Sequence, residues 1–286
     1  MKRRERRIAC INDMSCFGKC SLTVALPVIS ALGAEAAVLP TAVLSTHTGG
    51  FEGYTKLDMT REMERIIDHW SALDLHFDGI YTGYFSNTDQ IELAERFIDR
   101  FKGENTAVIV DPVMADNGSF YSGFDESFAD AISRLVKRAD IITPNVTEAF
   151  LLANLPYVRY QDDALLKGIE ERLMRLGARR VAITGVQTSP NSIGYRYFDG
   201  KDGFDIEYKK LEGVFHGCGD VFASALCGHV LRGTSYAHAV RASADFAEHC
   251  IEHTVKNDAV RKYGLCFEEC LGELTDFYRG MGETIC

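Results

Sequence analysis

The chain has 286 residues, of which 46% are hydrophobic and 25% are charged, and its formal net charge is −10. These are ordinary globular values for a chain that can bury a sizeable core. The negative charge argues against nucleic acid as the main partner, because phosphate backbones favour a basic protein face. No apolar run approaches the length of a membrane span.

The N-terminus is basic, with the sequence MKRRERR over residues 1–7. A signal peptide would continue with a long apolar segment, and here only four apolar residues precede Asn12 and Asp13. We therefore predict a flexible, solvated tail over residues 1–6. Cys266 and Cys270 lie four residues apart, but no matching set of ligands accompanies them in sequence, so we expect no zinc site. The nine cysteines then predict reduced thiols in a cytoplasmic protein.

Short apolar runs alternate along the chain with longer amphipathic segments. Strands are predicted at Arg7–Ile11, Ala36–Thr41, Gly79–Thr82, Ala107–Asp111, Ile141–Thr143 and Arg180–Thr184. Helices are predicted over residues 60–73, 88–101, 126–138, 146–154 and 162–176. Apolar strands without alternation are typical of a sheet covered on both faces. The order of the elements predicts a parallel sheet with right-handed crossovers.

The pattern changes after residue 190. Ile193–Phe198 and Phe204–Tyr208 flank a glycine-containing turn, which predicts a β-hairpin. Three helices should follow, over residues 219–232, 235–254 and 267–279. No linker, repeat or low-complexity segment interrupts the chain, so we expect residues 1–286 to form a single α/β domain.

The strongest local motif is Phe215-His216-Gly217-Cys218-Gly219-Asp220, which opens an apolar helix. Its two glycines allow backbone N–H groups to turn toward one point at a helix N-terminus, where the dipole favours an anion. Asp220 in the first turn could take a proton from an attacking hydroxyl. The alternative is a glycine turn with an aspartate cap, which is common at ordinary helix starts.

Two further motifs follow predicted strands, on the side of an open sheet where ligands bind. The first is Thr143-Pro144-Asn145-Val146-Thr147-Glu148. Within it, Asn145 and Glu148 are three residues apart, which is the pattern of a capping box. The functional alternative has Glu148 holding Mg²⁺ through water and Asn145 contacting metal or phosphate. Asp111, which directly precedes Pro112, either reaches into the crevice or merely starts a turn.

Together these motifs resemble the ribokinase superfamily, and most closely its pyridoxal kinase and hydroxymethylpyrimidine kinase branch, over residues 7 to 255. The matching segments are Asp-Pro-Val-Met at 111–114, Thr-Pro-Asn-x-x-Glu-Ala at 143–149, Ile-Thr-Gly at 183–185 and Gly-x-Gly-Asp-x-Phe-Ala at 217–223. The resemblance implies a ribokinase-like three-layer sandwich with a central, mostly parallel sheet and no large separate lid domain. It also implies a homodimer that uses ATP and Mg²⁺, and that could use a monovalent cation such as K⁺.

By this resemblance, Asp220 is the base that deprotonates the acceptor hydroxyl. The amides of Gly217, Cys218 and Gly219 would stabilise the phosphoryl group during transfer. The residues that correspond to the family's ATP-binding positions are Asn145, Glu148 and Thr184, and those near the metal are Asp111 and Glu148. The loop over residues 115–124 could fold over the phosphates and exclude water.

The acceptor side is implied by two further segments. Thr46–Gly50, which contains His47 and Thr48, resembles the segment of pyridoxal kinases that contacts the pyridine ring. Tyr84, after Gly83, matches an aromatic residue that packs on the substrate. The structural alternatives are a loop histidine that caps a backbone carbonyl and a core aromatic at a strand end.

Two positions depart from the family pattern. Pyridoxal kinases usually carry Gln-Ser where this chain has Asn12-Asp13. We hypothesise that Asp13 pairs with a cationic amine or a protonated pyridine nitrogen, which favours pyridoxamine or a substrate outside the B6 set. Cys218 replaces the commoner threonine. It either adds to the pyridoxal aldehyde, helped by a helix N-terminus that lowers a thiol's pKa, or simply fills the threonine site.

The function predicted from the sequence is transfer of the γ-phosphate of ATP to the 5′-hydroxymethyl group of a B6 vitamer. A kinase of hydroxymethylpyrimidine or another small hydroxymethyl heterocycle is the nearest alternative. A sugar kinase is less favoured, because the shielding insertion typical of sugar kinases is missing. A catalytically silent vitamin-binding or sensor protein is the alternative of another class.

Overall fold

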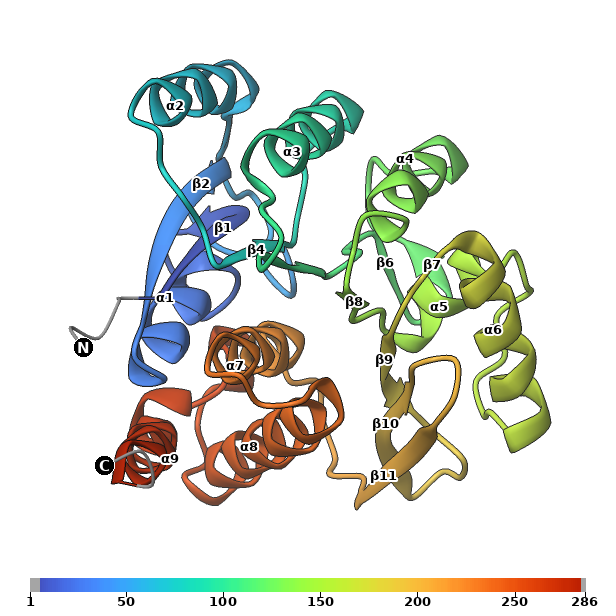
Figure 1. Cartoon of the computed structure of the whole chain (residues 1–286). Helices are drawn as coiled ribbons and strands as arrows, with labels where there is room; N and C mark the ends of the chain where they lie inside the picture. The colour runs from blue at the N-terminus through green and yellow to red at the C-terminus, as the bar shows by residue number, and fades with distance from the viewer. Residues whose placement is uncertain (1–5, 284–286) are drawn as a thin grey trace.

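The computed structural model of the protein describes residues 6–283, with the side chains of residues 6–277. Its centre is a nine-stranded sheet with the order β11-β10-β9-β8-β5-β4-β1-β2-β3 (Figure 1). The parallel strands are β1 (Arg6–Ser15), β2 (Ala34–Leu44), β4 (Gly79–Thr82), β5 (Ala107–Val110), β8 (Ile141–Ile142) and β9 (Val181–Val186). Antiparallel strands extend both edges: β3 (Lys56–Asp58) on one side, and β10 (Ser192–Phe198) with β11 (Gly203–Lys209) on the other.

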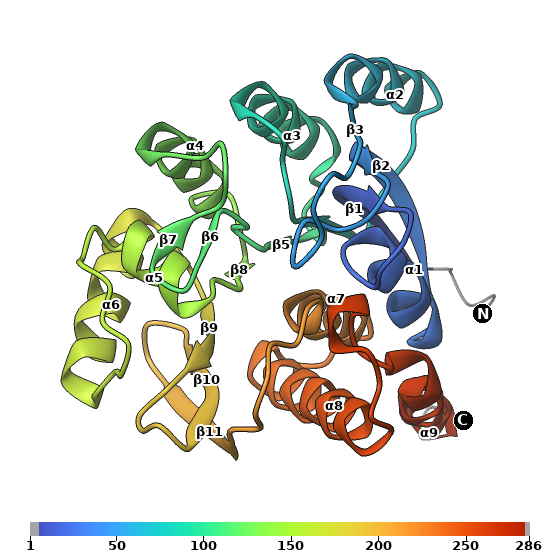
Figure 2. The same cartoon turned by 180° about the vertical axis from the view of Figure 1, so that it is seen from behind.

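Two layers of helices cover the two faces of the sheet (Figures 1 and 2). One layer contains α2 (Thr60–Ala72), α3 (Thr88–Phe101), α4 (Glu126–Val136), α5 (Val146–Leu152) and α6 (Asp163–Leu176). The other contains α1 (Leu22–Ala31), α7 (Cys218–Leu231), α8 (Tyr236–Lys256) and α9 (Leu271–Glu283). This is the predicted three-layer α/β sandwich with a mostly parallel sheet.

The strand sequences explain why the sheet is buried on both sides. Along β1, Ile8 and Cys10 pack into the core beneath α1 and α7, whereas Ala9 and Ile11 pack into the core beneath α2 and α3. Side chains of successive strand residues point to opposite faces, so a strand between two helical layers needs apolar residues at every position. The structure contains all six predicted parallel strands and the predicted hairpin.

The predicted limits of β1 need correction at both ends. The strand begins at Arg6, which pairs with Ala34, so the predicted tail over residues 1–6 is wrong at its last position. Residues 1–5 lie outside the described residues. The strand also continues to Ser15, and it therefore includes Asn12 and Asp13, which were expected to follow it.

Helix α1 was not predicted. Its sequence, LTVALPVISA, is apolar throughout and contains Pro27, so it carries neither an amphipathic stripe nor a favourable composition for a helix. The helix is held by packing instead, because it lies against β1, β2, α7 and α9. A helix buried on several sides needs no polar face.

The expected loop over residues 115–124 contains a small hairpin. β6 (Ala115–Asp116) pairs with β7 (Ser119–Phe120), and the turn residues Asn117 and Gly118 both have positive φ. That conformation is the one that tight two-residue hairpins favour. The backbone N–H of Gly118 donates to Thr147 Oγ1 at 2.9 Å, which fixes the hairpin to the first turn of α5.

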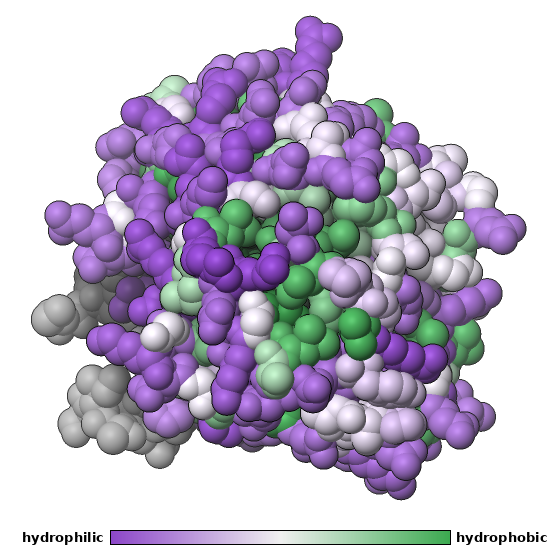
Figure 3. Space-filling view, turned by 90° about the vertical axis from the view of Figure 1, so that its right-hand side faces the viewer, coloured by the Kyte–Doolittle hydropathy of each residue, from purple (hydrophilic) through white to green (hydrophobic). Residues whose placement is uncertain are grey.

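Within the part of the chain that the structure describes, no helix is long and apolar enough to cross a bilayer. On the side of the molecule that lies to the right in Figure 1, hydrophobic side chains gather in a hollow and hydrophilic ones surround it (Figure 3). Some apolar surface between the elements therefore stays accessible.

Candidate active site

The carboxyl ends of the parallel strands lie along one edge of the sheet, and several predicted residues lie there. They are Asp13 in β1, Asp111 after β5, Asn145 after β8 and Thr184 in β9. Asp220 lies in the first turn of α7. Ligands of open α/β sheets bind in such a crevice, so these positions suit a shared site.

The N-terminus of α7 has the features of an anion site. Gly217 is its N-cap, with a left-handed φ of 79°, and a Cβ at this position would lie 2.2 Å from the carbonyl oxygen of Lys19. No side chain caps the helix, and a Cβ on Gly219 would meet no atom within 4 Å. The start of α7 therefore has open space beside Gly219, where an anion can approach the first backbone N–H groups.

The site carboxylates lie close enough to repel one another. Burial raises the pKa of Asp220 to about 7, and the charge of Asp13 adds to the shift. Burial also raises the pKa of Asp111, with Asp220 as the second cause, and it raises the pKa of Glu148, with Asp111 as the second cause. Among residues 6–277, none of the three carboxylates forms an ion pair with a Lys or Arg side chain. Crowded carboxylates without a cationic neighbour are the oxygen-donor set that Mg²⁺ prefers.

These charge effects also locate Asp220. Its carboxyl interacts electrostatically with Asp13 of β1 and with Asp111 beyond β5, which indicates that the first turn of α7 faces the crevice. A carboxyl with a pKa near neutrality is suited to act as a general base, because proton transfer is most efficient when the pKa lies near the working pH. The position of Asp220 is therefore compatible with the predicted role.

Asn145 and Glu148 form the capping box that their spacing predicts. Asn145 Oδ1 accepts from the N–H of Glu148 at 3.0 Å, and Glu148 Oε2 accepts from the N–H of Asn145 at 2.8 Å. Glu148 Oε1 also accepts from Met114 N at 3.0 Å. Direct ligation by Glu148 would compete with these bonds, which agrees better with a contact to metal through water. Thr184 pairs with Asn145 in an isolated parallel bridge.

Asp13 is 4% exposed and is already bonded within the protein. Its carboxylate accepts from Ser21 Oγ at 2.5 Å and from Ser15 Oγ at 2.9 Å. Burial nevertheless raises the pKa of Asp13, and the hydrogen bonds from Ser21 and Ser15 partly offset this rise. A cationic group of the acceptor would relieve this burial cost, so the pairing hypothesis stays a prediction.

His47 and Thr48 of the predicted acceptor segment differ in whether their side chains are already bonded within the protein. His47 is buried and bonds the carbonyl oxygen of Lys262 through Nε2 at 2.7 Å. That bond is the structural alternative expected for this histidine. Burial lowers the pKa of His47, which favours the neutral ring as donor. Thr48 is exposed, so its hydroxyl is accessible to a ligand.

Tyr84 follows β4 and is partly exposed. Its hydroxyl accepts from Lys56 Nζ at 3.1 Å, and its ring lies 5.8 Å from that of Phe124. Its backbone N–H donates to Asn12 Oδ1 at 2.8 Å, which ties the residue to β1. The ring is thus held at the strand ends rather than inside the core.

Cys218 does not have the low pKa expected of a thiol at a helix N-terminus. Burial raises its pKa to about 11, and the charge of Asp220 adds to the shift. In the covalent alternative the helix N-terminus lowers this pKa, and removal of water from the thiolate acts in the opposite direction. This result favours the small side chain filling the threonine site over covalent addition.

Several residues around the site were not predicted. Asn12 Nδ2 lowers the pKa of Asp220, although the two groups lie outside ordinary hydrogen-bond geometry. Ser21, with φ of 56°, lies between β1 and α1 and bonds Asp13. His216 lies 5.1 Å from His47, ring to ring. The sequence places Asn12 and His216 inside recognised motifs, but it gives no signal for Ser21.

Comparison with known proteins gives a consistent result. Residues 23–263 match the family model described as phosphomethylpyrimidine kinase. A Bacteroides thetaiotaomicron protein, assigned as a phosphomethylpyrimidine kinase and crystallised with pyridoxal, is 33% identical with a TM-score of 0.90, over 95% of this chain and 96% of that one. Pyridoxal kinase from Lactobacillus plantarum is 28% identical with a TM-score of 0.88, over 95% of this chain and 97% of that one.

A curated relative points to a second vitamin. The chloroplastic thiamine biosynthetic bifunctional enzyme of Arabidopsis thaliana is 28% identical over 80% of this chain. The aligned region covers 43% of that enzyme, so this chain corresponds to less than half of it.

Proposed function

Because this chain belongs to the phosphomethylpyrimidine kinase family, whose members are ATP-dependent kinases, we propose that it phosphorylates the 5′-hydroxymethyl group of a B6 vitamer, with Asp220 as the base. The observation that carries the proposal is the relation between two features of α7. The uncapped N-terminus of the helix faces the crevice, and the carboxyl of Asp220 lies within its first turn, with a pKa raised to about 7.

The phosphate would bind to the backbone N–H groups at residues 217–219. Phosphoryl transfer needs little covalent work from a protein, so positioning and charge stabilisation provide most of the acceleration. Asp220 accepts the proton of the acceptor hydroxyl as the oxygen attacks. Asn145 and Thr184 contact the nucleotide phosphates from the neighbouring strand ends.

Mg²⁺ would be held by Asp111 directly and by Glu148 through water, and when bound it would neutralise charge on the phosphates. The donor set supports this assignment, because burial and mutual repulsion raise the pKa values of both carboxyls. A divalent cation relieves that repulsion and favours the ionised forms. We extend the proposal to a homodimer and to a cytoplasmic location on the family resemblance alone.

The choice of a B6 vitamer as acceptor is supported by the relative crystallised with pyridoxal, which is 33% identical. In this chain, the exposed hydroxyl of Thr48 and the partly exposed ring of Tyr84 would contact the pyridine ring. The buried Asp13 would lie near the amine of pyridoxamine or the ring nitrogen.

Hydroxymethylpyrimidine is the second candidate acceptor, because the matching family model is described as a kinase of its phosphate ester, phosphomethylpyrimidine, and a plant relative is named a thiamine biosynthetic enzyme. The two acceptors present the same hydroxymethyl group on different aromatic rings. We call the start of α7, together with Asp111, Asn145, Glu148 and Thr184, the phosphate side of the crevice. It serves both acceptors equally well, so only the acceptor side can distinguish them.

An acceptor panel tests the proposal. The purified chain is incubated with ATP and Mg²⁺ and with pyridoxal, pyridoxine, pyridoxamine, hydroxymethylpyrimidine or ribose, and kcat/KM is measured for each. We expect the highest value for a B6 vitamer. A higher value for hydroxymethylpyrimidine would replace the acceptor but keep the mechanism. Absence of turnover with every acceptor, together with vitamin binding, would instead support the silent binding protein.

A further inference from the structure

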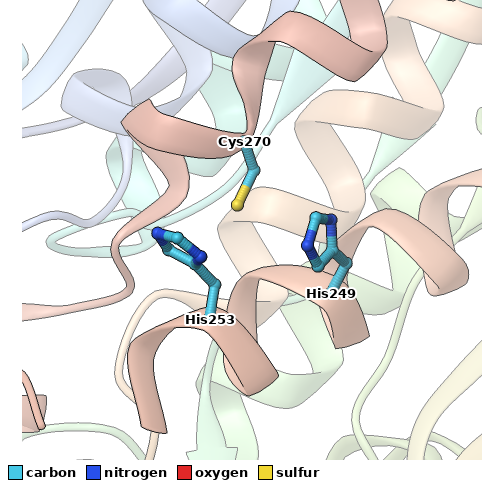
Figure 4. Close-up of side chains that lie close together, drawn as sticks. All are labelled: His249, His253 and Cys270. Atoms are coloured by element: carbon cyan, nitrogen blue, oxygen red, sulfur yellow. The ribbon is translucent and has the colours of Figure 1, made fainter. Parts of the chain in front are cut away.

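A group of metal-binding side chains lies outside the kinase site, where α8 meets the segment that precedes α9. His249 and His253 project from α8, and Cys270 ends the short 3₁₀ helix η2 (Phe267–Cys270) (Figure 4). One possible ligand atom from each of the three residues lies within 4.8 Å of the others. The sulfur of Cys270 points toward the two imidazole rings (Figure 4).

The spacing of the two histidines suits ligation from one helix. Residues four apart lie on the same face, one turn above the other, so both rings can approach the same point. Cys270 closes the group from a different element, seventeen residues beyond His253 in the sequence. Imidazole and thiolate together are the ligands of zinc and similar transition metals rather than of Mg²⁺ or Ca²⁺.

Two carboxylates complete the surroundings. Glu273 Oε1 lies 2.5 Å from His249 Nδ1, and Glu269 Oε2 lies 2.9 Å from His253 Nε2. A carboxylate bonded to a ligating histidine orients the ring and raises its basicity. Either carboxylate could also move onto the metal as a fourth ligand, since both are more than half exposed. The arrangement thus offers a tetrahedral set with negative charge.

We propose that His249, His253 and Cys270 bind one Zn²⁺ ion, with Glu269 or Glu273 completing the coordination. Bond lengths of about 2.0–2.3 Å place tetrahedral ligand atoms roughly 3.3–3.8 Å apart, so the donors need to close by about 1 Å. The histidine rings, which are 44% and 24% exposed, can make that adjustment by side-chain rotation. On binding, the sulfur of Cys270 forms a bond to the metal and its proton passes to solvent.

This proposal departs from the sequence analysis, which predicted no zinc site. The cysteine was noted there, but its partners are histidines on the preceding long helix. Nothing in the linear spacing indicates that the chain turns back after α8. The structure supplies that contact, because η2 packs against α8 and Cys266 N donates to Thr254 Oγ1 at 2.8 Å.

The ion would close the base of a loop that reaches the acceptor side of the kinase site. Between His253 and Cys270, the chain carries Lys262, whose carbonyl accepts from His47 at 2.7 Å. It also carries Tyr263, whose carbonyl accepts from Lys19 N at 2.8 Å. A metal that joins the two stems of a loop removes conformational freedom from it. The bound ion is therefore a structural clip for the loop over residues 257–265.

Zinc titration of the untagged, reduced full-length chain tests the proposal. The protein is first stripped with a chelator, and Zn²⁺ binding is then followed by calorimetry and by the thermal unfolding midpoint. We expect one equivalent of zinc and a higher Tm. Co²⁺ in place of zinc should give the near-ultraviolet absorption of a cobalt–thiolate bond. Glu273→Gln should weaken zinc binding by about 10–100-fold, as the loss of a carboxylate partner does in other sites.

The variants His249→Ala, His253→Ala and Cys270→Ser should each lose stoichiometric zinc binding, and Cys270→Ser should also lose the cobalt–thiolate absorption. The two histidine variants should keep the fold, because both side chains are partly exposed. His69→Ala, an exposed histidine near the end of α2, and Cys16→Ser, an exposed cysteine, are the matched controls and should bind zinc normally. The assignment would be overturned if the wild type bound no zinc, or if both histidine variants bound zinc as tightly as the wild type does.

Discussion

The two sides of the crevice differ in how the protein balances the charge of their carboxylates. On the phosphate side, α7 begins without a side-chain cap, and burial raises the pKa values of Asp111 and Asp220. On the acceptor side, both oxygens of Asp13 accept from serine hydroxyls, and His47 bonds a backbone carbonyl. The phosphate side therefore combines an uncapped helix start with several carboxylates that repel one another, whereas the acceptor side holds one carboxylate between two hydroxyl groups.

This difference determines what each side reveals about its ligand. An uncapped helix start beside crowded carboxylates suits a phosphate with its metal ion. Side chains that are already bonded to the protein give weaker information, because their structural role is sufficient to explain them. The chemistry of this kinase is therefore better determined by its structure than its acceptor is.

The largest expected effect is that of Asp220→Asn. Loss of a general base typically lowers a rate by about 10²–10⁴-fold, so kcat should fall by that amount while ATP binding, measured by calorimetry, is retained. In the wild type, kcat/KM should rise with pH up to about 7, because the base works only when it is ionised. Asp202→Asn, at the exposed β10–β11 turn, is the matched control. Equal turnover in Asp220→Asn would falsify the assigned base.

The two glycines of the anion site should separate stability from function. Gly217→Ala combines a left-handed backbone with a Cβ placed 2.2 Å from the Lys19 oxygen, so it should lower the free energy of unfolding by about 3 kcal/mol. Gly219→Ala meets no atom within 4 Å, so it should leave the unfolding midpoint almost unchanged. Its methyl group would instead occupy the space before the helix and raise the KM for ATP. Chemical denaturation and steady-state kinetics on both variants make the comparison.

A loss of stability in Gly219→Ala as large as in Gly217→Ala would contradict an open helix N-terminus. The phosphate side would then be satisfied within the protein, as the acceptor side is, and the contrast between the two sides would disappear.

Much of the fold and part of the site follow from the sequence alone. The apolar runs locate the parallel strands because burial on both faces leaves no alternative composition. The capping box of Asn145 and Glu148 is predicted because it depends on a local spacing of three residues. In contrast, α1 is hidden by its uniform apolarity and Pro27, since its stability comes from packing between other elements.

The parts of the site that could not be predicted depend on long-range contacts. The bond from His47 to Lys262 joins residues 215 positions apart, and no local pattern encodes it. The pKa of Cys218 shows a second limit: the sequence gives its place at a helix start, but burial, which reverses the expected shift, is a tertiary property. Position along the elements was therefore predictable, whereas partners and solvent access were not.

A smaller effect is expected for Asp13→Asn, and it tests the acceptor side. If Asp13 pairs with a cation of the substrate, kcat/KM for pyridoxamine should fall about tenfold relative to that for pyridoxine, because hydrogen bonds to charged groups contribute about 1.5–3 kcal/mol. Ser15→Ala removes one partner of the same carboxylate and serves as the control. If the ratio between vitamers stays constant while the unfolding midpoint falls, Asp13 has a structural role only.

The smallest expected effect is a pH dependence of stability on the phosphate side. The pKa of Asp111 is raised in the folded protein, so above the unfolded value of about 4 the folded state holds a proton that the unfolded state has released. Stability should therefore fall as pH rises from about 4 toward the raised folded pKa, at a rate of up to about 1.4 kcal/mol per pH unit. Denaturation of the metal-free protein at several pH values measures this slope.

Asp111→Asn should reduce that slope without abolishing it, because the amide does not titrate while Asp220 and Glu148, whose pKa values are also raised, still do. It should also make the metal-free protein more stable than the wild type above neutral pH. Mg²⁺ should produce a similar stabilisation in the wild type, since a cation favours the ionised carboxylates that burial penalises. Asp202→Asn should change neither behaviour, as its side chain is exposed. If the pH dependence of stability is unchanged in Asp111→Asn and does not respond to Mg²⁺, the protein itself already balances the charge of these carboxylates. The two sides of the crevice would then not differ as described.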